Sequence, residues 1–208
     1  MAFGDQMIRY QVHPVDPQVR ILEKAVSVLK NKNGVCVYPT DTVYGMGACA
    51  TNPRALDKIC TIVEKDKSRL FSFICSDFSQ MSRYVRIDNA HFKLLKHYLP
   101  GPFTFVLPAT NYVPKKVSPK RRTVGVRMPD NAVCLALVRM LGEPLANASI
   151  NISEELRGDP DEIAPIIMHE VNIMLDMGLL ENPMGSTIVD LTEKEPVVVR
   201  MGKGKWQE

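Results

Sequence analysis

The chain has 208 residues, of which 45% are apolar and 24% are charged, and its formal net charge is +3. This mixture is typical of a globular protein, and the length suits one domain with a substantial core. No apolar run is as long as a membrane span, and the first ten residues lack the charged and apolar segments of a secretory signal. A net charge of +3 is too small to indicate nucleic-acid binding by itself.

The predicted elements alternate between helix and strand along the chain. Helices are predicted to begin at Asp16-Pro17, Asn52-Pro53, Asp77, Asn89, Asp130 and Asp159-Pro160, where a capping side chain, a proline or both favour a helix start. Strands are predicted at 35–38, 70–75, 103–107, 123–128, 144–150, 171–176, 186–191 and 196–200. Two charged stretches, 64–69 and 111–122, are predicted to be loops. Short links between the late strands favour a mixed sheet over a purely parallel one, so we expect a single α/β domain over residues 1–208.

The five cysteines are widely spaced, odd in number and mostly within apolar segments: Cys36, Cys49, Cys60, Cys75 and Cys134. This pattern favours reduced core thiols over a disulfide or zinc framework, and it makes the cytoplasm the expected compartment. The four histidines have no spacing typical of metal ligands, so we expect solvated or structural roles for them and no protein-held metal: His13, His91, His97 and His169.

The stretch 35–47 is the part of the chain most typical of a ligand site. A short apolar strand ends in the polar residues Thr40, Asp41 and Thr42, and glycines follow at positions 45 and 47. Polar groups at a strand end are often presented at the mouth of a pocket, and glycines can let the backbone approach a ligand closely. An ordinary polar turn after a strand is the competing interpretation, and this stretch alone leaves both open.

Hydroxyls, an amide and arginines recur at the ends of later strands. Thr123 and Arg127 lie four residues apart on one predicted strand, so both side chains are expected on the same face. The same rule places Ser149 beside Asn151. Fixed guanidinium charges and hydroxyls suit a carboxylate or polyphosphate ligand, whereas phosphate-binding loops, dinucleotide fingerprints and nucleophile elbows are missing. The set therefore favours electrostatic positioning of charged substrates. The alternative is that each hydroxyl only forms a hydrogen bond with a nearby backbone group and binds no ligand.

Six segments, taken in order, resemble the YrdC/YciO family of threonylcarbamoyl-AMP synthases across nearly the whole chain. They are Y-P-T-D-T-V-Y-G-M-G at 38–47, P-G-P-F-T-F-V-L at 100–107, T-V-G-V-R-M-P at 123–129, S-I-N-I-S at 149–153, S-T-I-V-D at 186–190 and R-M-G at 200–202. The L-F-S-F-I-C-S-D segment at 70–77 is most similar to the YciO-like branch. Any one of these segments is weak evidence for the family, but six of them in order at the family's spacing are specific evidence.

The resemblance implies a twisted mixed sheet with helices around a basic cavity. It also implies a reaction, in which threonine, bicarbonate and ATP give threonylcarbamoyl-AMP and pyrophosphate for modification of adenosine 37 in transfer RNA. Magnesium is expected with the ATP. By position in the family's motifs, the expected threonine contacts are Thr40, Arg127 and Ser186. The expected nucleotide contacts are Lys65, Lys67, Thr123, Ser149, Asn151 and Arg200. The expected catalytic residues are Lys65, Arg127, Ser149 and Asn151.

The sequence departs from the synthases just after the second predicted helix, where they carry a K-x-R pair. Counting forward from Thr40 places Val63 at the lysine position and Lys65 at the arginine position. Loss of one fixed cation could cost several kcal/mol of transition-state stabilisation. The alternative is therefore a paralogue that binds a nucleotide or double-stranded RNA without full synthase activity. The basic loop 115–122, with Lys65, Lys67 and Arg69, would then form its phosphate-tracking surface, and solubility is the competing explanation for that loop.

Overall fold

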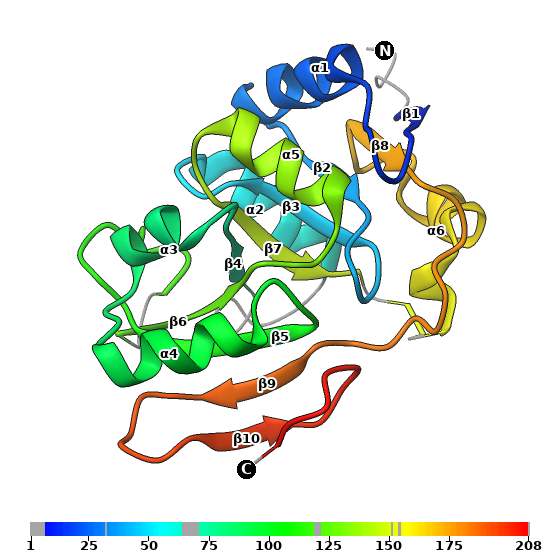
Figure 1. Ribbon diagram of the computed structural model, residues 1–208. Coiled ribbons are helices and arrows are strands. Elements are labelled where there is room, and N and C mark those ends of the chain that lie inside the picture. The colour runs from blue at the N-terminus through cyan, green and yellow to red at the C-terminus, as the bar shows by residue number, and fades with distance from the viewer. Residues whose placement is uncertain are drawn as a thin grey trace.

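Within the described residues, ten strands form one mixed sheet in the order β1-β8-β2-β3-β7-β4-β6-β5-β9-β10, as the computed structural model shows (Figure 1). The structure describes residues 7–31, 33–63, 71–118, 122–150, 152–153 and 155–207. The strands are β1 (Ile8–Gln11), β2 (Cys36–Tyr38), β3 (Gly45–Cys49), β4 (Ser72–Ile74), β5 (Phe103–Pro108), β6 (Thr123–Arg127), β7 (Leu145–Ser149), β8 (Ile173–Asp176), β9 (Thr187–Asp190) and β10 (Val197–Arg200). Parallel pairs such as β4–β6 and antiparallel pairs such as β5–β6 occur together, so the predicted mixed sheet is confirmed.

Helices cover both faces of this sheet. They are α1 (Val19–Lys30), α2 (Pro53–Val63), α3 (Phe78–Tyr84), α4 (Asn89–Tyr98), α5 (Ala132–Leu141) and α6 (Pro160–Ile167), with a short 3₁₀ helix η1 (Glu155–Gly158). Successive strand residues point to opposite faces, which gives each face its own core. Cys36 and Tyr38 pack with α1 and α5, whereas Val37 packs with α2 on the other side (Figure 1). The predicted α/β architecture follows from this alternation.

The predicted start of α1 is wrong by two residues, and the predicted cap of α5 is wrong by one. Helix α1 begins at Val19, because the backbone N–H of Asp16 donates to Nδ1 of His13 and holds Asp16 in a turn before the helix. Helix α5 is capped by Asn131, whose side-chain oxygen accepts from the N–H of Cys134, and not by Asp130. The other starts fall within one residue of the prediction, and their caps come from Asn52, Asp77, Asp88 and Asp159.

Two strands were not predicted. Strand β3 contains Gly45 and Gly47 and lacks the β-branched and aromatic residues that favour strands. Strand β1 is four residues long and pairs in parallel with β8, so that Ile8 lies opposite Ile173. That pairing joins segments far apart in the chain and leaves no local pattern. The remaining predicted strands are present, each with its ends shifted by a few residues at most.

The cysteines pack as predicted for core thiols. Cys36, Cys49, Cys75 and Cys134 are buried and free, and Cys60 on α2 is half-buried. Burial raises the pKa of each buried thiol, to about 12 for Cys49. No helix among the described residues is both long and apolar enough to span a membrane.

We therefore expect iodoacetamide at pH 7.5 to modify Cys60 in the folded protein roughly a hundredfold or more faster than the four buried thiols. Thiolate formation and access are both suppressed by burial, and both are restored on unfolding. Mass spectrometry of the alkylated peptides gives the rates, and the same reaction in concentrated urea should label all five cysteines at similar speed. A buried cysteine that reacts as fast as Cys60 in native buffer would contradict this packing.

Candidate functional site

A cavity of about 320 Å³ opens where the central strands meet the β2–β3 loop and η1. The middle of β6 forms part of its wall, and Gly125 there lies opposite Ser72 of β4 and Val106 of β5. A Cβ at position 125 would lie 3.1 Å from Cγ2 of Thr104, so the glycine keeps the cavity open at this point. The volume is at the small end of the range for ligand pockets.

Five of the predicted site residues line this cavity: Thr123, Arg127, Ser149, Ser186 and Arg200. They come from three strands and the segment just before β9, so the fold gathers residues that are up to 77 positions apart in the chain. Thr123 and Arg127 share a face of β6, as their spacing predicts. Three further predicted site residues, Lys65, Lys67 and Asn151, lie outside the described residues.

The cavity also has polar lining residues to which the sequence analysis assigned no ligand. They are Thr42, Ser72, Thr104, Ser118, Asn147 and Arg157. Thr42 and Thr104 belong to the matching segments at 38–47 and 100–107, which was the available signal for them. Arg157 lies in η1, where no periodic pattern or motif distinguishes it from a surface arginine.

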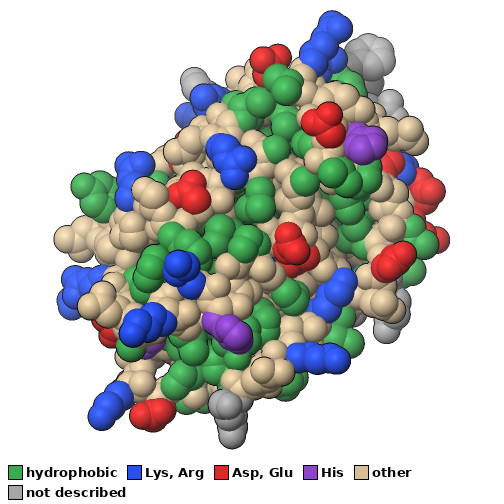
Figure 2. Space-filling view, viewed as in Figure 1, with side chains coloured by type: hydrophobic (Ala, Val, Ile, Leu, Met, Phe, Trp, Pro, Cys, Tyr) green, Lys and Arg blue, Asp and Glu red, His purple; other side chains and the backbone are tan. Residues whose placement is uncertain are grey.

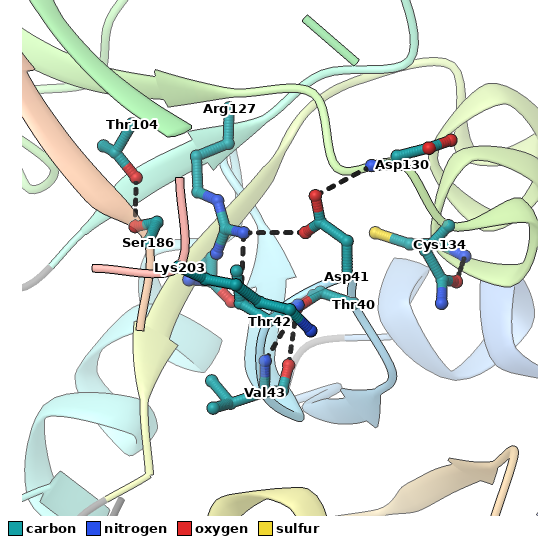
Figure 3. A network of polar contacts seen from close by, with 12 residues as sticks. Thr40, Asp41, Thr42, Val43, Thr104, Arg127, Asp130, Cys134, Ser186 and Lys203 are labelled. Atoms are coloured by element: carbon teal, nitrogen blue, oxygen red, sulfur yellow. Dashed lines mark hydrogen bonds and ion pairs between the residues drawn. The ribbon is translucent and has the colours of Figure 1, made fainter. Parts of the chain in front are cut away.

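Arg127 is 5% exposed and forms a buried ion pair with Asp41 (Figure 3). Its Nη2 donates to Oδ1 of Asp41 at 3.0 Å and to Oγ1 of Thr42 at 3.0 Å. The other carboxylate oxygen accepts from the N–H of Asp130 at 3.1 Å. Burial raises the pKa of Asp41, while the guanidinium of Arg127 and the N–H of Asp130 act to lower it. The pair fixes one guanidinium against the cavity and offsets its charge.

Thr40 supports the β2–β3 loop and does not line the cavity. Its hydroxyl donates to the carbonyl of Val43 at 2.6 Å and accepts from the N–H groups of Thr42 and Val43. Its Oγ1 also lies 2.9 Å from Oγ1 of Thr42 (Figure 3). These bonds hold Thr42 toward Arg127. The predicted contact between Thr40 and threonine stays a prediction, and Thr42 is the loop hydroxyl at the cavity.

The glycines of β3 make room for protein side chains, which corrects the expectation that they admit a ligand. A Cβ at Gly45 would lie 2.4 Å from Oδ1 of Asn147, and a Cβ at Gly47 would lie 2.9 Å from the hydroxyl of Tyr38. Tyr38 is fully buried and donates to Oδ1 of Asn147 at 2.8 Å. The glycines are therefore explained by the passage of the Tyr38 ring across β3 to Asn147, which itself lines the cavity.

The wall formed by Ser186 and Arg200 is tied to the neighbouring strand and to the C-terminal segment. Oγ of Ser186 lies 2.7 Å from Oγ1 of Thr104, and Nη2 of Arg200 donates to the Ser186 carbonyl at 2.7 Å (Figure 3 shows Thr104 and Ser186). The hydroxyl of Thr187 donates to the carbonyl of Gly204 at 2.6 Å. Trp206 then stacks on Tyr98 with ring centroids 4.7 Å apart. These contacts hold the β9–β10 end of the sheet against the cavity.

Three arginines and no carboxylate are among the described residues that line the cavity. The charge of Arg127 is offset by Asp41, and Arg157 and Arg200 are the other two arginines of this lining. The basic cavity that the family resemblance implies stays a prediction. Magnesium takes oxygen ligands and usually one or two carboxylates from a protein. The described lining offers hydroxyls and amides instead, and no cluster of three His, Cys, Asp or Glu side chains that could hold a metal occurs among the described residues. The described residues therefore do not fit a resident magnesium site.

Neither the position at which the family carries a lysine nor Lys116 of the basic loop adds a charge to the cavity lining. Val63, at the position counted as that of the family's lysine, is fully buried in the core at the end of α2 and does not line the cavity. Lys116 of the basic loop forms an ion pair with Asp57 on α2. On the face drawn in Figure 2, Lys and Arg side chains are interspersed with Asp and Glu. That face therefore has no extended patch of side chains of one charge.

Comparison with known proteins places this site in a family. The family model Sua5/YciO/YrdC, described as telomere recombination, matches residues 28–202. The uncharacterized protein YciO of Escherichia coli K12 is 38% identical over 199 residues, which cover 94% of this chain and 95% of YciO. The threonylcarbamoyl-AMP synthase of Pyrococcus abyssi is 32% identical over 171 residues, or 79% of this chain and 49% of the synthase.

Solved structures agree with the sequence matches. The crystal structure of E. coli YciO superposes with a TM-score of 0.89 at 37% identity, covering 96% of this chain and 97% of YciO. The crystal structure of P. abyssi Sua5 complexed with L-threonine gives a TM-score of 0.87 at 28% identity, covering 94% of this chain and 58% of Sua5. The length of the family match and the YciO relatives establish that this chain belongs to the Sua5/YciO/YrdC family.

Proposed function

We propose that this chain forms threonylcarbamoyl-AMP from threonine, bicarbonate and ATP, and that its product serves the modification of adenosine 37 in transfer RNA. The observation that carries the proposal is the gathering of Thr123, Arg127, Ser149, Ser186 and Arg200 around one cavity. Relatives named threonylcarbamoyl-AMP synthase, and a relative's structure with L-threonine, support the choice of substrate.

In this proposal the Arg127 end of the cavity binds threonine. A guanidinium held by a buried carboxylate has a fixed orientation, and its remaining N–H groups can bind the carboxylate of an amino acid. Thr42 and Ser186 supply hydroxyls beside it for the polar groups of the same substrate. Because Asp41 offsets the charge of Arg127, this end suits a zwitterion, whose own net charge is zero.

The remaining residues position ATP, which arrives with its own magnesium ion. The ammonium group of threonine first releases a proton to solvent, and the neutral nitrogen then attacks the carbon of bicarbonate, with loss of water to give the carbamate. A carbamate oxygen then attacks the α-phosphorus of ATP, and the bond to pyrophosphate breaks. Thr123, Ser149 and Arg200 would hold the nucleotide through these steps, and roles for Lys65, Lys67 and Asn151 are part of the same proposal. Alignment and charge neutralisation are the protein's contributions, with no covalent intermediate on a side chain.

Release of pyrophosphate from ATP tests this reaction, and we expect it to require both threonine and bicarbonate. The substitution Ser149→Ala should lower the rate by about 10²-fold or more, which is the scale for loss of one positioned hydrogen-bond donor. Ser149 is exposed at the end of β7, so the free energy of unfolding should not change. The matched control is Ser82→Ala, an exposed serine on α3 that does not line the cavity. Equal rates for the Ser149 variant and the control would remove Ser149 from the site.

The burial of Val63 favours a second candidate, a paralogue that binds a nucleotide or double-stranded RNA without completing the reaction. This residue cannot place a cation in the cavity, so the synthase chemistry would lack that charge unless another residue supplies it. ATP binding without threonine-dependent pyrophosphate release would support this candidate. A salt titration of double-stranded RNA binding distinguishes an RNA-binding paralogue from one that binds only a nucleotide. Affinity for a phosphate backbone falls steeply with salt, so the RNA-binding paralogue should show this fall.

A further inference from the structure

Arg157 presents a buried donor that has no partner. Its Nε is buried and, like Nε of Arg127, has no hydrogen-bond acceptor among the residues that the structure describes. The residue lines the cavity from η1. A buried guanidinium donor without an acceptor costs free energy, and native structures normally satisfy such groups. Because Arg157 lines the cavity, a ligand bound there would be able to supply this acceptor.

The backbone of Arg157 is held from two directions, so its side chain begins from a fixed position. The carbonyl of Arg157 accepts from the N–H of Tyr44 at 2.9 Å, which ties η1 to the start of β3. The next carbonyl, that of Gly158, accepts from the N–H of Leu180 at 2.9 Å. Gly158 also packs against Pro183 so closely that a Cβ there would lie 2.6 Å from the proline ring. The 3₁₀ helix is therefore a support for Arg157 against the cavity.

The charge of Arg157 distinguishes it from Arg127. Arg127 is paired with Asp41, whereas no carboxylate pairs with Arg157 within the described part of the chain. Tyr44 adjoins Gly45, and Gly45 pairs with Ser149 across β3 and β7, so η1 lies beside the Ser149 end of the cavity. An uncompensated guanidinium next to a free hydroxyl suits a ligand with several negative charges. Phosphate oxygens match the planar donor fork of arginine.

We propose that Arg157 is a phosphate-binding residue of the cavity and holds the polyphosphate of its ligand. The assignment of that polyphosphate to ATP rests on the proposed function, whereas the binding of a phosphate anion by Arg157 does not. In the synthase reaction Arg157 would stabilise the pyrophosphate as it leaves.

The test uses inorganic tripolyphosphate as the probe and measures its dissociation constant by isothermal titration calorimetry. We expect Arg157→Gln to weaken binding by about 10- to 100-fold, the effect of losing a hydrogen bond to a charged group. Arg157→Lys keeps the charge without the planar fork and should give an intermediate constant. The matched control is Arg20→Gln, at an exposed position of α1 away from the cavity, and it should bind as the parent protein does. Thermal unfolding of each variant verifies that it is folded.

Unchanged tripolyphosphate affinity in folded Arg157→Gln, or no binding by the parent protein, would overturn the assignment. A parallel measurement of L-threonine affinity should show no change in Arg157→Gln, and an equal loss for both ligands would mean that the substitution acts through the shape of the cavity. Failure of the proposed function would be distinguishable from failure of the Arg157 assignment. Tripolyphosphate binding that depends on Arg157, without threonine-dependent pyrophosphate release, would leave a phosphate site in a protein with another activity.

Discussion

The substitution Val63→Lys is expected to destabilise the protein by about 4–5 kcal/mol at pH 7 and to leave any synthase activity unimproved. Val63 is fully buried at the end of α2 among apolar residues. A lysine there must become neutral in the folded state, and deprotonating an ordinary lysine at pH 7 has a free-energy cost of this size. Urea unfolding measures the loss, and pyrophosphate release measures activity.

The pH dependence of the stability lost in Val63→Lys tests whether deprotonation of the buried lysine causes that loss. The folded pKa of the introduced lysine would lie below its unfolded value, so the unfolded chain binds an extra proton at pH 7. Stability of the variant relative to the parent should therefore rise with pH, by about 1.4 kcal/mol per pH unit, until the ordinary lysine pKa is approached. The matched control is Thr61→Lys, on the exposed side of the same helix, which should show neither the loss nor this slope. A stable Val63→Lys protein with increased pyrophosphate release would contradict the packing of α2.

The substitution Arg127→Met is expected to abolish turnover and to destabilise the protein by about 3–5 kcal/mol. It removes the guanidinium and leaves the carboxylate of Asp41 buried without its partner. Adding Asp41→Asn should recover most of the stability, because the second change removes the stranded charge, but it should recover no activity. The matched control is Arg20→Met on the exposed face of α1.

The stabilities of the two Arg127 variants should be similar at acid pH and should diverge as pH rises. Burial already raises the pKa of Asp41, and loss of Arg127 removes the largest interaction that lowers it. With a folded pKa above the unfolded value, the stability is retained below the unfolded pKa and is lost as pH rises through the folded pKa. Arg127→Met should therefore lose stability between pH 4 and pH 7 relative to the double variant. If the free energy of unfolding changes with pH in the same way for both proteins, the ionisation of Asp41 is not the cause of the lost stability.

The sequence predicted those parts of the fold whose signals are local. Caps at Asn52, Asp77 and Asp159 and the spacing of apolar residues predicted most helices, because both signals lie within one or two turns. Strand β1 could not be predicted, since its partner β8 is more than 160 residues away. Strand β3 was missed because its glycines accommodate Tyr38, a requirement that only the packed sheet reveals.

The residues of the candidate site likewise include some that have a signal in the sequence and some that have none. The spacing of Thr123 and Arg127 on one strand predicted their common face, and the family resemblance supplied Ser186 and Arg200. Neither signal reaches Arg157, which enters the cavity from a 3₁₀ helix positioned by Tyr44 and Leu180. Nor does sequence indicate that Asp41 offsets Arg127, because the two are 86 residues apart and meet only when β6 packs beside the β2–β3 loop.

Incorporation of ¹³C-bicarbonate is the most direct test of the proposed reaction. The purified chain would be incubated with threonine, ATP, magnesium and labelled bicarbonate, and the products would be resolved by mass spectrometry. We predict threonylcarbamoyl-AMP that is one mass unit heavier than the unlabelled product and that is missing when Arg127 is replaced. ATP and threonine that both bind to the parent protein without forming this labelled adenylate would contradict the synthase assignment.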